Sequence, residues 1–300
     1  MKISKRLFLT TLFIIAIQIN IPFALPPIPT EVKSIVTFIF IPDGKNEKLI
    51  ANGTGFFVSI KNSKNIGSFS RYLVTSKHVI QTPDNKSFVP RIYVRMNKKI
   101  GGTEMLPLSL NISGSEKNVH FHKDKNVDLS VISISLDSQK YDFKVLTEDY
   151  LISKEDFKNL NIREGSEVFF TGLFSSHLGM QRNEPIVRFG RVALVTDEKI
   201  NFYGANADLY VIEIGSYGGN SGSPVFFYLG VEREPGSIFA GPPVMKLAGI
   251  MEGYFGQYMP VDNIDAKKET PLQSRSNTGI AAVIPSYKLF EILVSDELNK

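Results

Sequence analysis

Short apolar segments separated by turn-forming residues recur along almost the whole chain. Glycine, proline, asparagine and serine stand between the segments, and β-branched and aromatic residues fill them. Many short strands with few helices indicate an all-β sandwich or barrel. The expected strands are residues 35–41, 55–60, 72–75, 91–96, 128–134, 167–172, 186–195, 210–214, 225–229, 247–251 and 279–284.

Two segments depart from this pattern and predict helices. Near the end of the chain, Leu289, Phe290, Leu293 and Val294 recur at helical spacing, and Ser286 is expected to cap that helix. The other helix is expected at residues 153–160, close to the midpoint of the chain. We therefore place a domain boundary there, between an N-terminal barrel of residues 30–152 and a C-terminal barrel of residues 153–300.

The first residues have the pattern of an export signal. Three basic residues precede an apolar run over residues 7–19, which is short for a membrane span. We predict a signal peptide of residues 1–24 and a secreted or periplasmic protein. An uncleaved signal anchor is the alternative.

Charge and cysteine content exclude several classes of function. The predicted leader carries three basic residues and no acidic one, so its removal lowers the net charge from +4 to +1. Such a balance, without a long basic run, excludes an electrostatic footprint for nucleic acid. The chain has no cysteine, which excludes disulfides, cysteine metal sites and a cysteine nucleophile.

Three segments carry residues suited to nucleophilic catalysis. A predicted strand ends just before His78, Asp128 opens a second apolar strand, and Ser221 lies in a glycine-rich turn that leads into a third. Hydrolysis of an amide needs a nucleophile, a base, a group that orients the base, and donors for the oxyanion. Ser221, His78 and Asp128 fit the first three roles in that order. The backbone amides of Gly219 and Ser221 fit the fourth, because glycine permits the conformation that brings them together.

Several motifs in one order resemble the trypsin-like, or chymotrypsin-like, serine peptidases, particularly their cysteine-free bacterial branch. The matching motifs are GTGFFV at 53–58, LVTSKHV at 73–79, DLSVI at 128–132, GNSGSP at 219–224, LAGI at 247–250 and TGIAAVIPS at 278–286. The resemblance implies two six-stranded β-barrels packed perpendicular to each other, with the active site between them. It also implies a serine endopeptidase that acts on a protein or peptide substrate.

The same resemblance implies a pocket for the substrate residue that precedes the scissile bond. Its lining is expected to include Gly215, Met251, Glu252 and Gly253. Gly215 offers no carboxylate for a basic side chain, the absence of histidine from residues 247–256 argues against a glutamyl endopeptidase, and Met251 favours an apolar pocket. Glu252 is expected close to Asp128, and two neighbouring carboxylates disfavour joint ionisation, so the pKa of one should be raised.

Two residues of the nucleophile turn depart from the family pattern. Ser223 stands where the family usually has a second glycine. Asn220 stands where the digestive members have an aspartate that receives the ammonium group of a newly cut N-terminus. Because an amide cannot attract a buried ammonium in this way, we expect no activation by N-terminal cleavage.

The sequence also bears on three other assignments. An α/β-hydrolase esterase is excluded because Ser223 replaces the last glycine of its G-x-S-x-G elbow and the candidate base precedes the nucleophile. A degenerate, protease-like binding or adhesive module of the cell envelope remains the alternative. His120 and His122 alternate near Asp124, which predicts a solvated polar face rather than a metal site. We expect no metal, no cofactor and no membrane span beyond the leader.

Overall fold

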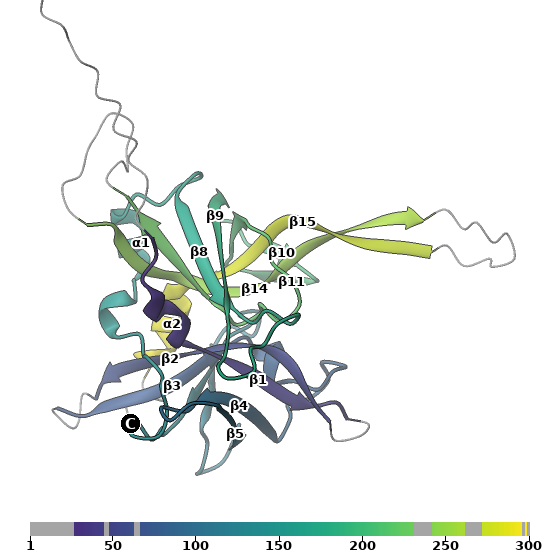
Figure 1. Cartoon of the computed structure of the whole chain (residues 1–300). Helices are drawn as coiled ribbons and strands as arrows, with labels where there is room; N and C mark the ends of the chain where they lie inside the picture. The colour runs from purple at the N-terminus through teal and green to yellow at the C-terminus, as the bar shows by residue number, and fades with distance from the viewer. Residues whose placement is uncertain are drawn as a thin grey trace, which may run out of the picture.

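Two antiparallel β-sheet structures, one from each half of the chain, lie against each other in the computed structural model (Figure 1). The structure describes residues 27–44, 48–62, 67–230, 242–261, 272–295 and 298. The predicted signal peptide lies outside the described residues. Among the described helices, none is long and apolar enough to cross a membrane.

The N-terminal half forms a seven-stranded sheet. Its strands are β1 (Val36–Pro42), β2 (Leu49–Lys61), β3 (Phe69–Thr75), β4 (Arg91–Asn97), β5 (Thr103–Ser109), β6 (Val119–Phe121) and β7 (Ser130–Ser133), in the order β5-β4-β1-β2-β3-β7-β6. The two outer strands approach each other, because the backbone amides of Asn118 and Val119 both donate to the carbonyl of Asn111, at 2.9 and 3.2 Å. The sheet therefore curls into a barrel-like shape.

The C-terminal half forms a closed barrel of six strands. These are β8 (Glu167–Gly172), β9 (Ile186–Leu194), β12 (Tyr210–Glu213), β13 (Pro224–Leu229), β14 (Val244–Val261) and β15 (Leu272–Pro285), in the order β12-β15-β14-β13-β8-β9. A small hairpin, β10 (Ile200–Phe202) and β11 (Ala205–Ala207), stands beside the barrel. The outer parts of β14 and β15 continue as a twisted ribbon that projects from the barrel (Figure 1).

The structure confirms the predicted all-β, chymotrypsin-like fold class, with one closed six-stranded barrel and a curled second sheet. Four short strands were missed: β5, β6, β10 and β11. Strand β5 contains Pro107 and lies at the edge of its sheet, where a missing backbone donor is tolerated. A proline in an apolar run argues against a strand, so the sequence signal there is weak.

Both predicted helices are present, with one correction at a cap. Helix α1 (Lys154–Asn159) follows a capping box, in which Ser153 and Asp156 bond to each other's backbone amides. Helix α2 (Ser286–Leu293) begins after Pro285, which is its N-cap residue. The prediction that Ser286 caps this helix is wrong, because its hydroxyl is buried and has no hydrogen-bond partner.

One hydrophobic core joins the two halves. It includes Phe56 and Val74 from the first sheet, Phe226 and Ile250 from the barrel, and Leu289 from α2, all buried. This shared core fixes the end of β3 and the turn before β13 relative to each other, and those are the segments that carry His78 and Ser221.

Candidate active site

His78 lies in a short 3-10 turn, η2 (Lys77–Ile80), that follows the end of β3. Val79 and Ile80 are fully buried and anchor the turn in the core of the first sheet. The side chain of His78 stays 35% exposed, and its Nε2 atom makes no hydrogen bond among the described residues. The sequence pattern of a strand followed by this histidine thus produces a fixed backbone and an accessible ring.

Asp128 lies two residues before β7, a strand paired with β3, and it holds His78 by two contacts. Its Oδ2 lies 2.5 Å from Nδ1 of the imidazole, and its Oδ1 accepts a hydrogen bond from the His78 amide at 3.1 Å. A carboxylate at Nδ1 places the proton there and leaves Nε2 as the free base. Burial alone lowers the pKa of His78, but the charge of Asp128 and the hydrogen bond to it outweigh burial, so the pKa is raised.

Ser221 lies in a turn that is fastened to both halves of the molecule. Its carbonyl accepts a hydrogen bond from the Thr54 amide at 2.9 Å, and the Gly222 amide donates to the Met251 carbonyl at 2.8 Å. Gly222 has a φ of 82°, and a Cβ there would lie 2.1 Å from the Thr54 carbonyl oxygen and 2.3 Å from the Thr75 hydroxyl. Only glycine fits, so the serine turn packs directly against the segment that leads to His78.

The Ser221 hydroxyl itself donates to the backbone carbonyl of Glu252 at 3.1 Å. In the part of the chain that the structure describes, no hydrogen bond joins it to His78. The geometry therefore brings His78 and Asp128 into direct contact and places the Ser221 turn beside them.

Both backbone amides predicted as oxyanion donors are available to a ligand, as is the amide of the exposed Gly218. The amides of Asn220, Gly222 and Ser223 all donate within the protein, to Tyr217, Met251 and Asn220 in that order. The amides of Gly219 and Ser221 make no hydrogen bond among the described residues. Gly219 has a φ of 94°, a conformation that favours glycine. The two residues predicted as oxyanion donors thus have free N–H groups on the same turn.

The turn is held in this conformation by two buried side chains, of which one was not expected. Asn220 accepts from the Tyr217 amide at 2.8 Å and donates to the Leu173 carbonyl at 2.7 Å. The hydroxyl of Thr54 donates to the Gly219 carbonyl at 2.9 Å and accepts from the Leu173 amide at 2.8 Å. The turn is therefore ordered by neutral hydrogen bonds. The only sequence signal for Thr54 is its place between two glycines in GTGFFV.

We expect Asn220→Asp to destabilise the protein by about 3–5 kcal/mol at pH 8, because the new carboxylate is buried and faces the Leu173 carbonyl. At pH 5 much of this loss should disappear, since a protonated carboxyl can again donate to that carbonyl. Urea unfolding at both pH values measures the difference. The exposed Asn206→Asp serves as the control with little expected change, and an Asn220→Asp protein as stable as the wild type at pH 8 would contradict the proposed role of the amide.

Glu252 is the most unusual ionisable group near the site. Its carboxyl is buried, and its Oε2 has no hydrogen-bond partner among the described residues. Burial first, and the negative charge of Asp128 second, raise its pKa to about 8, while the charge of Lys77 lowers it in part. Glu252 is thus close enough to Asp128 to feel its charge, and it is neutral at pH 7.

The other three residues expected to line the pocket, Met251, Gly253 and Gly215, have different surroundings. The Met251 side chain is fully buried in the core of the C-terminal barrel, where it faces away from solvent. Gly253 lies against the ring of Phe202, which a Cβ would approach to 3.1 Å. A Cβ on Gly215 would lie 2.8 Å from Nη1 of Arg188, so a guanidinium fills the space beside this glycine.

Ser223 is accommodated by a glycine on the neighbouring strand. A Cβ on Gly172 would lie 2.0 Å from the Ser223 hydroxyl, so the serine occupies space that any side chain at 172 would take. The Ser223 amide still donates to the Asn220 carbonyl at 3.0 Å. The departure from the family pattern at this position therefore leaves the turn intact.

The histidines ahead of Asp128 are both buried, which corrects the expected solvated face. The Nε2 atom of His122 lies 2.7 Å from the Glu291 carboxylate on α2, and its Nδ1 accepts from the Asp124 amide at 3.0 Å. Helix α2, from the far end of the sequence, covers this face, which the local pattern could not reveal. No group of three or more His, Cys, Asp or Glu residues in the described ranges is arranged to hold a metal ion.

The two packed β-structures with this site between them define a chymotrypsin-like class of fold. The chain belongs to the family described as the trypsin-like peptidase domain, whose model matches residues 53–230. A crystal structure of the MamO protease domain from Magnetospirillum magneticum, in its apo form, is similar, with 15% sequence identity and a TM-score of 0.49. That match covers 89% of this chain and 99% of the other. No curated protein sequence matches the chain.

Proposed function

We propose that this protein is a serine endopeptidase that uses Ser221 as nucleophile, His78 as general base and Asp128 as the residue that orients the base. The observation that carries the proposal is the 2.5 Å contact between Asp128 and Nδ1 of His78, on a side chain that stays 35% exposed. Family membership supports a peptidase, and the free amides of Gly219 and Ser221 supply what acyl transfer needs beyond these three side chains.

In the proposed reaction, the Ser221 hydroxyl turns from the Glu252 carbonyl to Nε2 of His78 and attacks the carbonyl carbon of the scissile bond. His78 takes the hydroxyl proton, and the amides of Gly219 and Ser221 stabilise the oxyanion that forms. His78 then protonates the leaving amine. Water, activated by the same base, releases the acyl group. The raised pKa of His78 favours the imidazolium that exists between these two proton transfers.

The alternative is a degenerate, protease-like binding or adhesive module. The observation that favours it is the hydrogen bond from Ser221 to the Glu252 carbonyl, because a hydroxyl held there is not activated. The proposed enzyme differs from this state in the direction of the Ser221 hydroxyl, while His78 and Asp128 are already in contact and the amides of Gly219 and Ser221 are free. We therefore prefer the enzyme. The predicted leader, residues 1–24, supports the further proposal that the protein works outside the cytoplasm.

We expect a fluorophosphonate probe to label the wild-type protein at Ser221, because the probe reacts with a serine only when a base activates it. Labelling should fall by at least about 1,000-fold in His78→Ala and disappear in Ser221→Ala. Gel fluorescence gives the rate, and mass spectrometry of the labelled peptide gives the residue.

The matched control is Ser115→Ala, an exposed serine in the loop between β5 and β6, away from the nucleophile turn. It should label at the wild-type rate. If Ser221→Ala folds and labels as fast as the wild type, the assignment of the nucleophile is wrong. If the folded wild type does not label at all, the binding module is the better description.

A further inference from the structure

Arg188 on β9 carries a partly buried guanidinium whose hydrogen bonding is incomplete. Its Cζ atom lies 5.0 Å from the centre of the Tyr217 ring, and its Nε is buried without a hydrogen-bond partner. Within the described ranges of the chain, neither a carboxylate nor a carbonyl pairs with this guanidinium. A buried donor without an acceptor costs free energy, so Arg188 favours an acceptor from outside the chain.

A cavity of about 270 Å³ lies beside this guanidinium, on the outer face of the nucleophile turn. Its walls come from the loop between β8 and β9, from β9 itself and from residues 217–220 of the turn. None of its described lining residues is acidic. The walls include neither a member of the proposed triad nor a residue expected to line the substrate pocket. The cavity is therefore separate from the substrate pocket.

Several polar groups of the cavity can donate to an anion. The Gly218 amide makes no hydrogen bond among the described residues, and Ser175 and Ser176 add exposed hydroxyl groups. A planar guanidinium can present two parallel N–H groups to a carboxylate, and stacking on Tyr217 holds that plane. Leu173, Phe174 and Ile186 supply apolar walls. A carboxylate on a short aliphatic chain therefore suits this cavity better than a bare inorganic ion.

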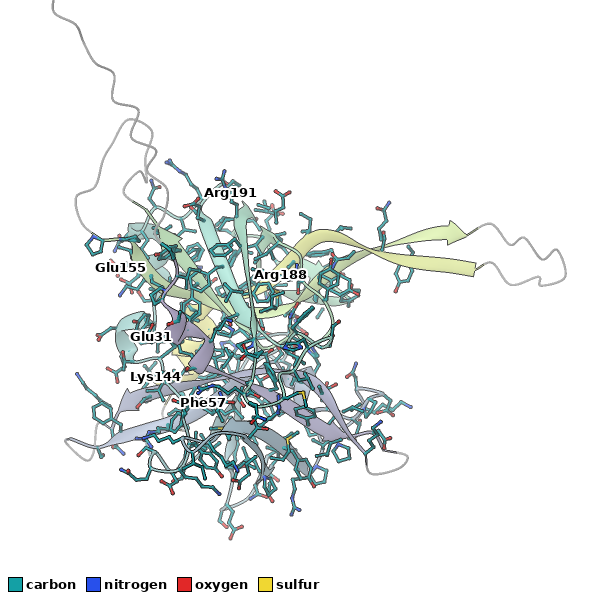
Figure 2. All side chains as sticks on the ribbon, viewed as in Figure 1. Glu31, Phe57, Lys144, Glu155, Arg188 and Arg191 are labelled. Atoms are coloured by element: carbon teal, nitrogen blue, oxygen red, sulfur yellow. The ribbon has the colours of Figure 1, made fainter. Side chains whose placement is uncertain are left out.

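The walls of the cavity are held by bonds to the rest of the molecule. Arg95 of β4 donates to the carbonyls of Leu178 and Gly179 in the loop between β8 and β9, at 2.7 and 2.6 Å. At the start of this loop, the Leu173 carbonyl accepts from the Asn220 side chain at 2.7 Å. Figure 2 shows Arg188 nearer the middle of the molecule, whereas Arg191 of the same strand lies at the outer rim of the barrel.

Tyr217 connects the cavity to the oxyanion donors. Its amide donates to Oδ1 of Asn220 at 2.8 Å, and the Asn220 amide donates to the Tyr217 carbonyl at 3.0 Å. Gly219, whose amide is one of the two free oxyanion donors, lies between Gly218 and Asn220, which both line the cavity. A ligand that fixes the guanidinium of Arg188 also fixes the ring stacked on it, and so restrains the turn.

We propose that this cavity binds a carboxylate of a peptide from outside the chain, either an acidic side chain or a C-terminal carboxylate, and that the bound carboxylate stabilises the oxyanion turn. A carboxylate gives Arg188 the charged acceptor that it lacks, whereas a neutral amide offers only a weaker one. The binding is independent of the proposed peptidase function, and the effect on the turn rests on that function.

Three small probes of nearly equal size test the class of ligand. N-acetylglutamate α-amide has only the side-chain carboxylate, N-acetylglutamine has only the terminal carboxylate, and N-acetylglutamine α-amide has neither. We expect one of the first two to bind Ser221→Ala protein roughly 10- to 100-fold more tightly than the third, the range for hydrogen bonds to a charged group. Isothermal titration calorimetry measures the affinities, and the tighter carboxylate probe identifies the source. This comparison does not depend on any variant of the cavity.

Arg188→Gln should remove the advantage of the carboxylate probe, and far-UV circular dichroism checks that this variant is folded. Arg191→Gln should keep the advantage, because Arg191 lies on the same strand but faces Glu167 at the surface, 3.7 Å away. In the wild type, a saturating carboxylate probe should raise the rate of fluorophosphonate labelling at least about fivefold, the lower end of typical coupling between two sites.

Equal binding of all three probes would overturn the inference. Binding that is lost once the wild type carries the fluorophosphonate label would overturn it too, because the probe would then occupy the substrate cleft. A preference in a peptide library for Asp or Glu on the leaving-group side would assign the cavity to the substrate instead. Binding that leaves the labelling rate unchanged would overturn the effect on the turn. A wild type that binds the carboxylate probe but never labels would support the site and contradict the proposed peptidase function.

Discussion

Asp128→Asn should lower kcat/KM by about 10,000-fold while the protein stays folded. The carboxylate accepts a hydrogen bond from Nδ1 of His78 at 2.5 Å. An Asn amide at this place can turn its NH₂ group toward Nδ1, which stabilises the tautomer with the proton on Nε2. That tautomer cannot take a proton from Ser221. The pKa of His78 should also fall, because the charge and the hydrogen bond that raise it are lost while burial, which lowers it, remains.

Asp124→Asn is the matched control for this change. Asp124 lies four residues earlier, and its carboxylate contacts Lys199 at the surface, 3.3 Å away. At each pH from 5 to 9, this variant should react with the fluorophosphonate probe at nearly the same rate as the wild type. A folded Asp128→Asn protein that labels within about tenfold of the wild type would show that Asp128 does not orient the base.

Local patterns in the sequence predicted the β-structure well where strands are buried and apolar. The predicted strand at 167–172 coincides with β8, since its residues are nearly all buried. The twisted ribbon formed by the outer parts of β14 and β15 was not predicted. Strand β14 runs from Val244 to Val261, far beyond the predicted 247–251, because its outer part pairs with β15 away from the barrel. Cross-strand pairing, which is not visible in one segment alone, extends it.

The ordering of the site could be predicted only in part. Asp128 and His78 are separated by 50 residues and meet because β3 pairs with β7. The sequence shows that His78 follows one strand and that Asp128 precedes another, which suggests that the two residues are neighbours. Thr54 and Arg188 reach the nucleophile turn from strands of different halves. Nothing in the local sequence distinguishes Arg188 from an ordinary strand residue, and the only local signal for Thr54 is its place between two glycines. Their roles depend on which neighbours the shared core brings near, and on the glycines at 215 and 222 that let those neighbours approach.

Glu252→Gln should make the protein more stable above pH 8, and this effect should vanish in acid. The pKa of Glu252 is about 8 in the folded protein, against 4.5 as its ordinary value. Between these two pH values the folded state holds a proton that the unfolded state has released. The free energy of unfolding therefore falls as pH rises through this window. Glutamine stays neutral and avoids the loss.

The full pKa shift corresponds to a gain in the free energy of unfolding of Glu252→Gln over the wild type of at most about 4–5 kcal/mol above pH 8. Below pH 4 we expect no gain. Urea unfolding of the wild type and Glu252→Gln at pH 4, 6.5 and 9 measures the divergence. Glu104→Gln is the control with the opposite sign, since a hydrogen bond from Lys140 lowers the pKa of that exposed carboxyl. Parallel stability curves for the wild type and Glu252→Gln would contradict a neutral Glu252.

Ionisation of Glu252 should also disturb the site, because its backbone carbonyl accepts from the Ser221 hydroxyl and the adjacent Met251 bonds to the serine turn through both backbone groups. A carboxylate that is buried and repelled by Asp128 can reach water only if this segment moves. We therefore expect the labelling rate of the wild type to fall at least about tenfold between pH 7.5 and pH 9.5. Glu252→Gln should keep its rate over that range. An equal fall in the labelling rate of both proteins would show that another group, and not Glu252, causes the fall.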